Sequence, residues 1–569
     1  MNTASIPVGI SDFAKVRAQG SYYIDKTGLI KQLLDARGTE IMLFTRPRRF
    51  GKTMAVSMLA EFFDIQKDSR SLFEGLEISH EKKLCAEWQN QFPVLYLTLK
   101  DVGGLAFDTA YGQLAYELAG LCRDHAYLGR DETLDIQERQ QFLQLKAGEA
   151  GSTEVRNALR FLMKLMHAHY GRKVILLLDE YDVPAAKAES GHYYAEMMDV
   201  MRTMFSTALK DNPHLQFAVL TGCLRIAKES IFTGANHFVV NTVSDKGFRQ
   251  FFFFFQKEVE QLLADMECEG HAEIIRQWYD GYNFGGMDMY CPWDVLNYVK
   301  KLKAGQLQKP ENFWEHTSDN AVIGRFLSRT GFSAEEKFET LLNGAYIKER
   351  ISENLTYDVM ESSESNLWSL LYMTGYLTRV HKKELLSDDC LLEGETALRI
   401  PNEEVKDIFR KSVAEWFEKK AAGSDRRTLF AALWNADMDK LTGILSDLLF
   451  DTISYFDYRE SFYHAFLTGL FSSAGYAVES NYENGLGRTD LVIKDRGNRR
   501  AAVVEAKTAG SQSTLEQECR KALAQIERNQ YARRVQRQGY QKVLCIGIAF
   551  YKKMCLAKAE SETMGSCLK

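Results

Sequence analysis

The segment that most constrains the fold runs from residue 40 to residue 65 and reads as a strand, a turn and a helix in direct succession. Residues 40–44, EIMLF, form a short apolar run of the strand type, and residues 54–65, MAVSMLAEFFDI, place apolar side chains at helical spacing. The basic turn TRPRRFGKT separates them. An apolar strand followed by an amphipathic helix is typical of a parallel sheet flanked by helices, so the segment predicts an α/β domain.

The turn ends in Gly51, Lys52 and Thr53, which fill the last three fixed positions of the phosphate-binding pattern G-x-x-x-x-G-K-[ST]. In this context the backbone N–H groups face phosphate oxygens, Lys52 reaches the β/γ-phosphates and Thr53 ligates Mg²⁺. The first glycine of the pattern is replaced by Arg46. A GK[ST] tripeptide also occurs in ordinary surface turns, so other parts of a nucleotide site have to be found elsewhere in the chain.

A second part of such a site is the run KVILLLDEYDVP, residues 173–184. Residues 174–178 are typical of a buried central strand, and Asp179 and Glu180 follow it. The pattern matches the Walker B motif, in which Asp179 holds Mg²⁺ and Glu180 orients or deprotonates the attacking water. An acidic turn after an apolar strand is common, but its occurrence after the GKT segment favours a nucleotide site.

A third part follows the apolar strand of residues 215–220, which ends in Thr221 and Gly222. In P-loop ATPases of the AAA type, a polar residue at this place contacts the γ-phosphate or the attacking water, and Thr221 occupies it. Arg225 stands four residues later and can approach the phosphates. A salt bridge at a helix start is an equally good interpretation of Arg225.

The basic entrance of the loop, Arg46 to Phe50, predicts a nonstandard backbone. Pro47 fixes its own φ and disfavours helix at Arg46, which indicates a stiff, extended entry. Arg46, Arg48 and Arg49 can contact phosphate with planar guanidinium groups, and an acidic partner is the alternative. Together with Phe50, they are assigned to the nucleotide site.

These motifs, in this order, resemble the bacterial and archaeal AAA-ATPase-like family, whose members carry RPRRFGKT without the first glycine. The resemblance covers residues 5 to about 240 and implies ATP and Mg²⁺ as cofactors. It also implies that an N-terminal motif lies near the nucleotide; in this sequence that motif comprises Gly9, Ile10, Asp12, Phe13, Tyr23, Asp25, Lys26 and Thr27. The run of phenylalanines at 251–255 stands where the family usually has a glycine, and it is interpreted as core or a packing surface.

A second constellation lies near the C-terminus, in GRTDLVIKD and RRAAVVEAKTA. Glu505 and Lys507 are two residues apart on one predicted strand and therefore share a face. A hairpin turn at residues 496–498 brings Asp490 beside them. Two carboxylates on one sheet face can bind Mg²⁺, which polarises a phosphodiester, while Lys507 stabilises charge or positions the nucleophile.

This constellation resembles the PD-(D/E)XK nuclease core, over residues 440 to about 558, with Thr489 in place of the motif proline. Glu460 fits the acidic residue of the first helix, and the helix at 522–534 carries Gln525 and Tyr531. The resemblance implies catalytic roles for Glu460, Asp490, Glu505 and Lys507, with Asp490 and Glu505 as metal ligands. Because the superfamily includes inactive members, a catalytically inactive fold stays open.

Length and composition complete the prediction. The 569 residues suggest three or four domains, and the motifs divide them into three regions: a P-loop domain at 1–245, a mainly helical lid or linker region at 246–439, and a nuclease-like domain at 440–569. The net charge of −6 gives no global sign of nucleic-acid binding. The ten cysteines form no CxxC pair, no apolar run suits a membrane helix, and the N-terminus lacks signal-peptide features. A reduced, cytoplasmic protein is expected.

The sequence therefore predicts an ATP-binding and hydrolysing protein that controls a Mg²⁺-dependent nuclease, with DNA favoured over RNA and a homo-oligomer possible. The alternative is a nucleotide-gated binding or scaffold protein with an inactive nuclease fold. A strand-translocating motor ranks last, because no set of helicase motifs is present.

Overall fold

A computed structural model describes residues 4–36, 38–132, 134–225, 238–306, 309–314, 334–355, 357, 362–385, 391–422, 426–452, 463, 466–467, 470–471, 477–484 and 487–563. The chain divides into two compact units: residues 1–318 with 348–405, and residues 319–347 with 406–569. Within the described residues, no helix is both long and apolar enough to cross a membrane. Each unit is described by itself.

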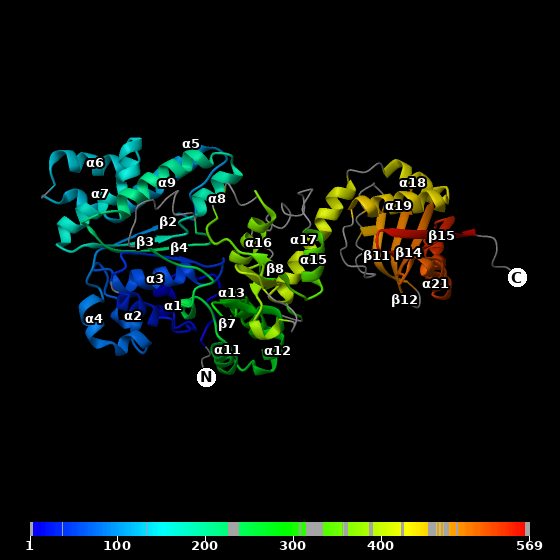
Figure 1. The fold of residues 1–569 in the computed structure, drawn as a ribbon, viewed down its shortest axis with the longest axis horizontal. Coiled ribbons are helices and arrows are strands. Elements are labelled where there is room, and N and C mark those ends of the chain that lie inside the picture. The colour runs from blue at the N-terminus through cyan, green and yellow to red at the C-terminus, as the bar shows by residue number, and fades with distance from the viewer. Residues whose placement is uncertain are drawn as a thin grey trace. The chain divides into compact units, whose positions relative to one another are not determined.

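The first unit is built on a five-stranded sheet of order β2-β3-β4-β1-β5 (Figure 1). All four strand pairs are parallel. The strands are β1 (Ile41–Thr45), β2 (Val94–Thr98), β3 (Val174–Asp179), β4 (Leu215–Gly222) and β5 (Phe238–Asn241). Every residue of β1 and β3 is buried, as expected for strands covered on both faces.

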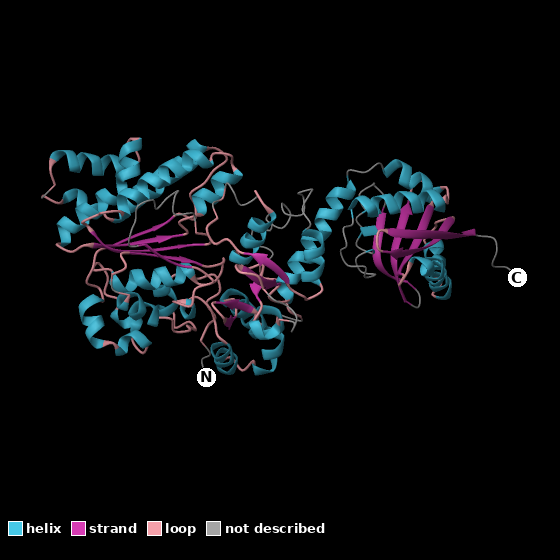
Figure 2. Ribbon diagram, in the orientation of Figure 1, coloured by secondary structure: helices cyan, strands magenta, loops and turns pink. Residues whose placement is uncertain are grey.

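Helices cover both faces of this sheet (Figure 2). Helix α3 packs on one face, while α7 and α9 pack on the other, where they bury a large apolar core. The helices of this part are α1 (Phe13–Ala18), α2 (Gly28–Asp35), α3 (Lys52–Phe63), α4 (Lys82–Trp88), α5 (Phe107–Asp124), α6 (Ile136–Ala147), α7 (Ser152–Tyr170), α8 (Val183–Ser190) and α9 (Tyr194–Leu209). The predicted α/β class is confirmed.

The middle of the chain is mainly helical, as predicted, with two small sheets. Its helices are α11 (Gln256–Asp265), α12 (Ala272–Tyr279), α13 (Pro292–Lys303), α15 (Ala334–Leu342), α16 (Glu364–Met373) and α17 (Glu403–Ala422). Strands β6 (Tyr282–Phe284) and β7 (Met287–Met289) form a hairpin, and β8 (Ile347–Arg350), β9 (Thr378–Arg379) and β10 (Glu395–Arg399) form a sheet of order β8-β10-β9.

The second unit carries a five-stranded sheet of order β11-β12-β13-β14-β15, in which only β13 and β14 are parallel. The strands are β11 (Ala477–Asn484), β12 (Gly487–Asp495), β13 (Arg500–Thr508), β14 (Lys542–Tyr551) and β15 (Met554–Thr563). Helices α18 (Arg426–Trp434) and α19 (Met438–Thr452) pack on one face, and α21 (Leu515–Arg528) and α22 (Tyr531–Arg537) on the other. Gly547 permits a close approach of α21, since a Cβ there would lie 2.5 Å from the Cys519 carbonyl oxygen.

Candidate functional sites

The loop between β1 and α3 has the geometry of a phosphate-binding turn. Gly51 adopts a left-handed conformation with φ of 75° and caps the N-terminus of α3. Arg49 is also left-handed, with φ of 74°, which costs about 1 kcal/mol or more for a residue with a Cβ. The loop therefore turns sharply just before the helix, and the first backbone N–H groups of α3 are available to an anion.

Lys52 is buried at the centre of this turn, with 3% of its side chain exposed. Its Nζ donates to the carbonyl oxygens of Arg46 and Pro47, both at 3.1 Å, and lies 3.6 Å from Glu180 Oε1. Burial alone would lower the pKa of Lys52, but the anionic groups around it outweigh burial and raise the pKa. The ammonium is thus kept charged by surrounding anionic groups, among them the carboxylates of Glu180, Asp182 and Asp179, and it has two carbonyl oxygens as hydrogen-bond partners that a phosphate oxygen can replace.

Asp179 ends β3 and is 1% exposed. Thr53 Oγ1 donates to its Oδ2 at 2.8 Å, and Thr221 Oγ1 donates to its Oδ1 at 2.5 Å. Burial raises the pKa of Asp179, and the two hydroxyl hydrogen bonds oppose the rise. The carboxylate and the Thr53 hydroxyl form an all-oxygen donor set, which fits Mg²⁺. The structure thus joins three residues that the sequence placed on separate segments.

Glu180 follows Asp179 in a left-handed conformation, with φ of 53°. Its side chain is 21% exposed, and its Oε1 faces Lys52 Nζ. A partly exposed carboxylate beside the phosphate-binding lysine is placed where a water molecule can reach it. The predicted role of Glu180 as the base stays a prediction.

Asp182 was missed by the sequence reasoning and is one of the most tightly held carboxylates of this site. It is 1% exposed and accepts hydrogen bonds from the backbone N–H groups of Cys223 and Leu224 and from the Tyr357 hydroxyl, the last at 3.0 Å. Burial and the charge of Glu180 raise its pKa to about 6. Asp182 thus fixes the end of β4 beside Lys52. The sequence feature that could have indicated Asp182 is the third acidic residue of DEYD, residues 179–182.

The three arginines of the loop occupy different environments. The Arg46 side chain is fully buried, and its Nη1 donates to the carbonyl oxygens of Thr45 and Asn241 at 2.9 and 2.7 Å. Arg49 stacks on Trp293, with 4.2 Å from Cζ to the ring centroid, and its Nη1 donates to the Phe313 carbonyl oxygen at 3.2 Å. Arg48 is exposed.

Phe50 is fully buried and anchors the loop against the middle of the chain. Its ring lies 4.9 Å from that of Phe253 and 5.1 Å from that of Tyr282. Phe50 therefore stabilises the loop by packing against these aromatic rings.

Arg225 is the last described residue before the segment 226–237. Its Nε is buried and has no hydrogen-bond partner among the described residues. Neither the phosphate contact nor the salt bridge predicted for Arg225 is tested, and both stay predictions.

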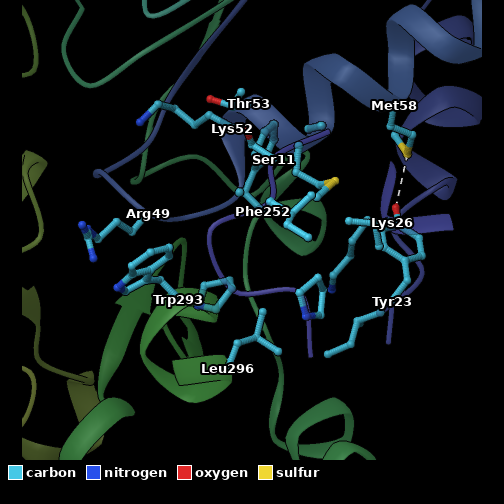
Figure 3. A pocket seen from close by; sticks show the side chains of 18 of the residues that line it. Ser11, Tyr23, Lys26, Arg49, Lys52, Thr53, Met58, Phe252, Trp293 and Leu296 are labelled. Carbon is cyan, nitrogen blue, oxygen red and sulfur yellow. Dashed lines mark hydrogen bonds between the residues drawn. The ribbon is translucent and has the colours of Figure 1, made fainter. Parts of the chain in front are cut away.

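A cavity of about 450 Å³ opens beside the loop (Figure 3). Gly51, Lys52 and Thr53 form part of its wall, and Arg49 and Trp293 lie together at one end of it. The rest of the lining is mostly apolar; much of it comes from residues 7–11, 22–26 and 251–254, and further residues of α3 and α13 contribute to it. The phenylalanine run is thus buried core, as interpreted from the sequence, and also lines the cavity.

The N-terminal motif lies against the phosphate-binding region, as the resemblance implied. Gly9, Ile10, Tyr23 and Lys26 line the cavity. Lys26 is fixed there by an ion pair with Glu258 at 2.6 Å. The remaining residues of the motif brace the segment: Asp12 caps α1, Phe13 is fully buried, and Asp25 accepts hydrogen bonds from Thr27 and from the backbone N–H of Glu77.

In the second unit the structure brings Asp490, Glu505 and Lys507 together. Asp490 Oδ2 accepts a hydrogen bond from the Ala506 backbone N–H at 2.8 Å, across the β12–β13 hairpin. Lys507 Nζ lies 3.4 Å from Glu505 Oε1, which also accepts a hydrogen bond from Gln525 Nε2. Gln525 comes from α21, on the face of the sheet that the alternation of β13 assigns to Glu505.

Glu505 is a buried carboxyl group with a raised pKa. It is 2% exposed, and its Oε2 has no hydrogen-bond partner among the described residues. Burial, followed by the charge of Asp490, raises its pKa to about 7. A buried carboxylate oxygen left unpaired beside a second carboxylate is the donor chemistry that a hard divalent cation satisfies.

Among the described residues of this region, no further acidic side chain completes a larger cluster. Glu479 forms an ion pair with Lys494 at 2.6 Å. Glu460 lies outside the described residues. Among the residues described, no group of three or more His, Cys, Asp or Glu side chains has the geometry to hold a metal ion.

Comparisons with known proteins define the class of each unit. Residues 7–232 match the family described as "Predicted AAA-ATPase", and residues 458–560 match the "PD-(D/E)XK nuclease superfamily". The chain therefore combines an AAA-ATPase-like domain with a domain of the PD-(D/E)XK nuclease superfamily.

A relative aligns with nearly the whole chain. The chain is 26% identical, over 567 residues and 97% of both chains, to a protein of Azotobacter chroococcum mcd 1 named "Uncharacterized protein in vnfD 5'region". It also aligns with "Structure of the Aeropyrum Pernix ORC2 protein (ADPNP-ADP complexes)" at 12% identity, over 68% of this chain and 92% of that chain. The TM-score of 0.25 is too low to carry an argument.

Proposed function

We propose that the protein binds and hydrolyses ATP at the loop between β1 and α3, and that the nucleotide state controls a Mg²⁺-dependent phosphodiesterase in the second unit. DNA is the favoured substrate, by the class of the second domain. The single observation that carries the proposal is the hydrogen-bonded line of Thr53, Asp179 and Thr221 beside buried Lys52.

At the first site each side chain has a distinct task. Lys52 exchanges its carbonyl partners for phosphate oxygens, and the left-handed turn at Gly51 aims backbone N–H groups at the same anion. Thr53 and Asp179 would hold Mg²⁺, which would supply positive charge beside the phosphates. Glu180 takes a proton from the attacking water, and Thr221 keeps Asp179 in place.

The base and ribose occupy the cavity of Figure 3. Its apolar lining suits a flat aromatic base, and its volume of about 450 Å³ is in the range of small-molecule sites, roughly 300–1,000 Å³. The phenylalanines at 251–254 and the N-terminal segment provide this lining. Lys26 is held in an ion pair and is therefore a wall residue rather than a phosphate ligand.

At the second site Asp490 and Glu505 hold Mg²⁺, and Glu460 is a further candidate from outside the described residues. A bound Mg²⁺ would polarise the phosphodiester and lower the pKa of a bound water molecule. Lys507 stays beside Glu505 and stabilises the charge that develops on the phosphate. Gln525 keeps Glu505 oriented through its hydrogen bond.

The test uses the full chain and measures two reactions. Lys52→Ala is expected to lose ATP binding, and Glu180→Gln to bind ATP while its hydrolysis falls by about 100-fold or more. DNA and RNA, single- and double-stranded, are then offered with Mg²⁺ or Mn²⁺, with and without ATP. Glu505→Ala and Lys507→Ala are expected to stop cleavage.

Three results would count against the proposal. Unchanged ATP turnover in both loop variants would overturn the ATPase assignment. Failure of the wild type to cut any substrate favours the scaffold alternative. Equal cleavage by wild type and both nuclease variants would place the active site elsewhere.

A further inference from the structure

A pair of buried carboxyl groups lies behind the phosphate-binding loop, outside both sites. Asp294 on α13 and Glu404 on α17 are both 0% exposed. Glu404 Oε1 accepts the backbone N–H groups of Phe313 and Trp314 at 2.5 and 3.1 Å. The other Glu404 oxygen and both Asp294 oxygens are buried with no donor among the described residues, and the two carboxyl groups act directly on each other. Two carboxylates in contact in a buried site cannot both ionise at neutral pH, so the pair shares a proton.

The pair faces a loop arginine. The charge of Arg49 acts on Asp294 and stabilises its ionised form. Arg49 and Glu404 also share a hydrogen-bond partner, Phe313. Its carbonyl oxygen accepts a hydrogen bond from Arg49, and its backbone N–H donates to Glu404. Arg49 therefore contributes both charge and geometry to the pair.

The same arginine lies on the wall of the nucleotide cavity. Arg49 and Trp293 line it together with Gly51, Lys52 and Thr53. Trp293 immediately precedes Asp294 in the sequence, and Arg49 stacks on its ring. An anionic ligand at the loop thus competes with the pair for the guanidinium.

We propose that the Asp294–Glu404 pair positions the phosphate-binding loop through Arg49, and that it takes up a proton from solvent when nucleotide phosphates draw Arg49 away. This rests on the proposed nucleotide binding. Before binding, the pair holds one proton and one negative charge opposite Arg49. After binding, a solvent proton converts the remaining carboxylate to a carboxylic acid and replaces the lost cation.

The titration window follows from the surrounding groups. Burial raises the pKa of Asp294 to about 6, and the neighbouring Cys291 and Glu404 side chains and the charge of Arg49 oppose this rise. Burial and then the charge of Asp294 raise the pKa of Glu404 well above its ordinary value. The other titratable groups facing the pair are Tyr279 and Tyr282, both with raised pKa values and therefore neutral. Removing the cation raises the pKa of Asp294 further.

Glu404 also belongs to the first turn of α17. The charge state of the pair therefore acts on the start of that helix, where a negative charge is stabilised by the helix dipole. Asp294 and Glu404 are positioning residues, since they act on the loop only through Arg49.

The experiment measures proton exchange when ADP binds to the full chain. Calorimetric titrations at pH 6.5, in buffers of different ionisation enthalpy, give the number of protons taken up. A rise of about one unit in the pKa of Asp294 predicts about half a proton more for wild type than for Asp294→Asn. Arg49→Gln is expected to lose the same increment, because its pair is already protonated before ADP arrives.

The matched control is Asp280→Asn. Asp280 is a carboxylate of the same region whose pKa burial also raises to about 6, but its charge partners are Asp288 and Arg276 rather than the loop. Asp280→Asn is expected to retain the wild-type proton uptake. If wild type and Asp294→Asn both bind ADP and take up the same number of protons, the proposed coupling is wrong, whereas the proposed nucleotide site is retained. If wild type binds no ADP, the proposed function fails and the coupling fails with it.

Discussion

Replacing Glu505 by glutamine should stabilise the metal-free protein at alkaline pH. The wild-type carboxyl has a pKa of about 7 in the folded chain, against an ordinary value of 4.5. An acid with a raised folded-state pKa imposes no penalty below pH 4.5, and its penalty grows as the pH rises toward 7. Glutamine keeps the shape and an oxygen for Gln525 but carries no charge to bury beside Asp490.

The magnitude follows from the shift. A rise from 4.5 to about 7 corresponds to about 3 kcal/mol at pH 8, since one pKa unit is about 1.4 kcal/mol, and to less than about 1 kcal/mol at pH 5. We therefore expect Glu505→Gln to raise the free energy of opening of β13 by about 2–3 kcal/mol at pH 8 and to change it little at pH 5. Mg²⁺ should stabilise the wild type and have little effect on the variant.

Hydrogen exchange of the β13 and β14 amides in the full chain measures this free energy, with wild type and variant compared at each pH. Glu527→Gln on α21 removes an exposed carboxylate and is the matched control, expected to change nothing. A variant that is less stable than wild type at pH 8 without metal would refute the reasoning. So would a stabilisation of equal size at pH 5 and pH 8.

Two further predictions concern the first unit. Gly281→Ala should destabilise it by more than about 3 kcal/mol in chemical unfolding, because a Cβ would lie 2.0 Å from the Pro401 carbonyl oxygen. Gly286→Ala, also left-handed but with nothing within 4 Å of its Cβ, should cost only about 1 kcal/mol, and equal losses would rule out the contact as the cause. Asp182→Asn should destabilise by about 1–3 kcal/mol, because an amide oxygen cannot satisfy all three donors. It should lower kcat for ATP more than it raises KM, and an unchanged kcat would contradict its role in holding β4.

Sequence reasoning reached the elements that depend on local pattern. Consecutive residues determine the apolar runs of β1, β3 and β4 and the turn at Gly51. The strands, the loop and the helix that follows it could therefore be predicted from the sequence. Because the GKT turn and the Walker B pattern both supply Mg²⁺ ligands, Thr53 and Asp179 could be assigned to one site from the sequence. The pairing of Asp490 with the β13 carboxylate followed in the same way from the hairpin and the period of two.

Other features depend on contacts between distant segments, and no local pattern encodes them. The loop arginines are alike in sequence, yet Arg46 is buried against Asn241 while Arg49 stacks on Trp293. Asp182 and the Asp294–Glu404 pair become unusual only through burial and through partners that are distant in the sequence, such as Tyr357, which is 175 residues from Asp182. The sequence by itself determined which strands and turns form and the chemistry they carry. The tertiary structure decided which charges lose water and which groups replace it, because desolvation depends on everything packed around a side chain.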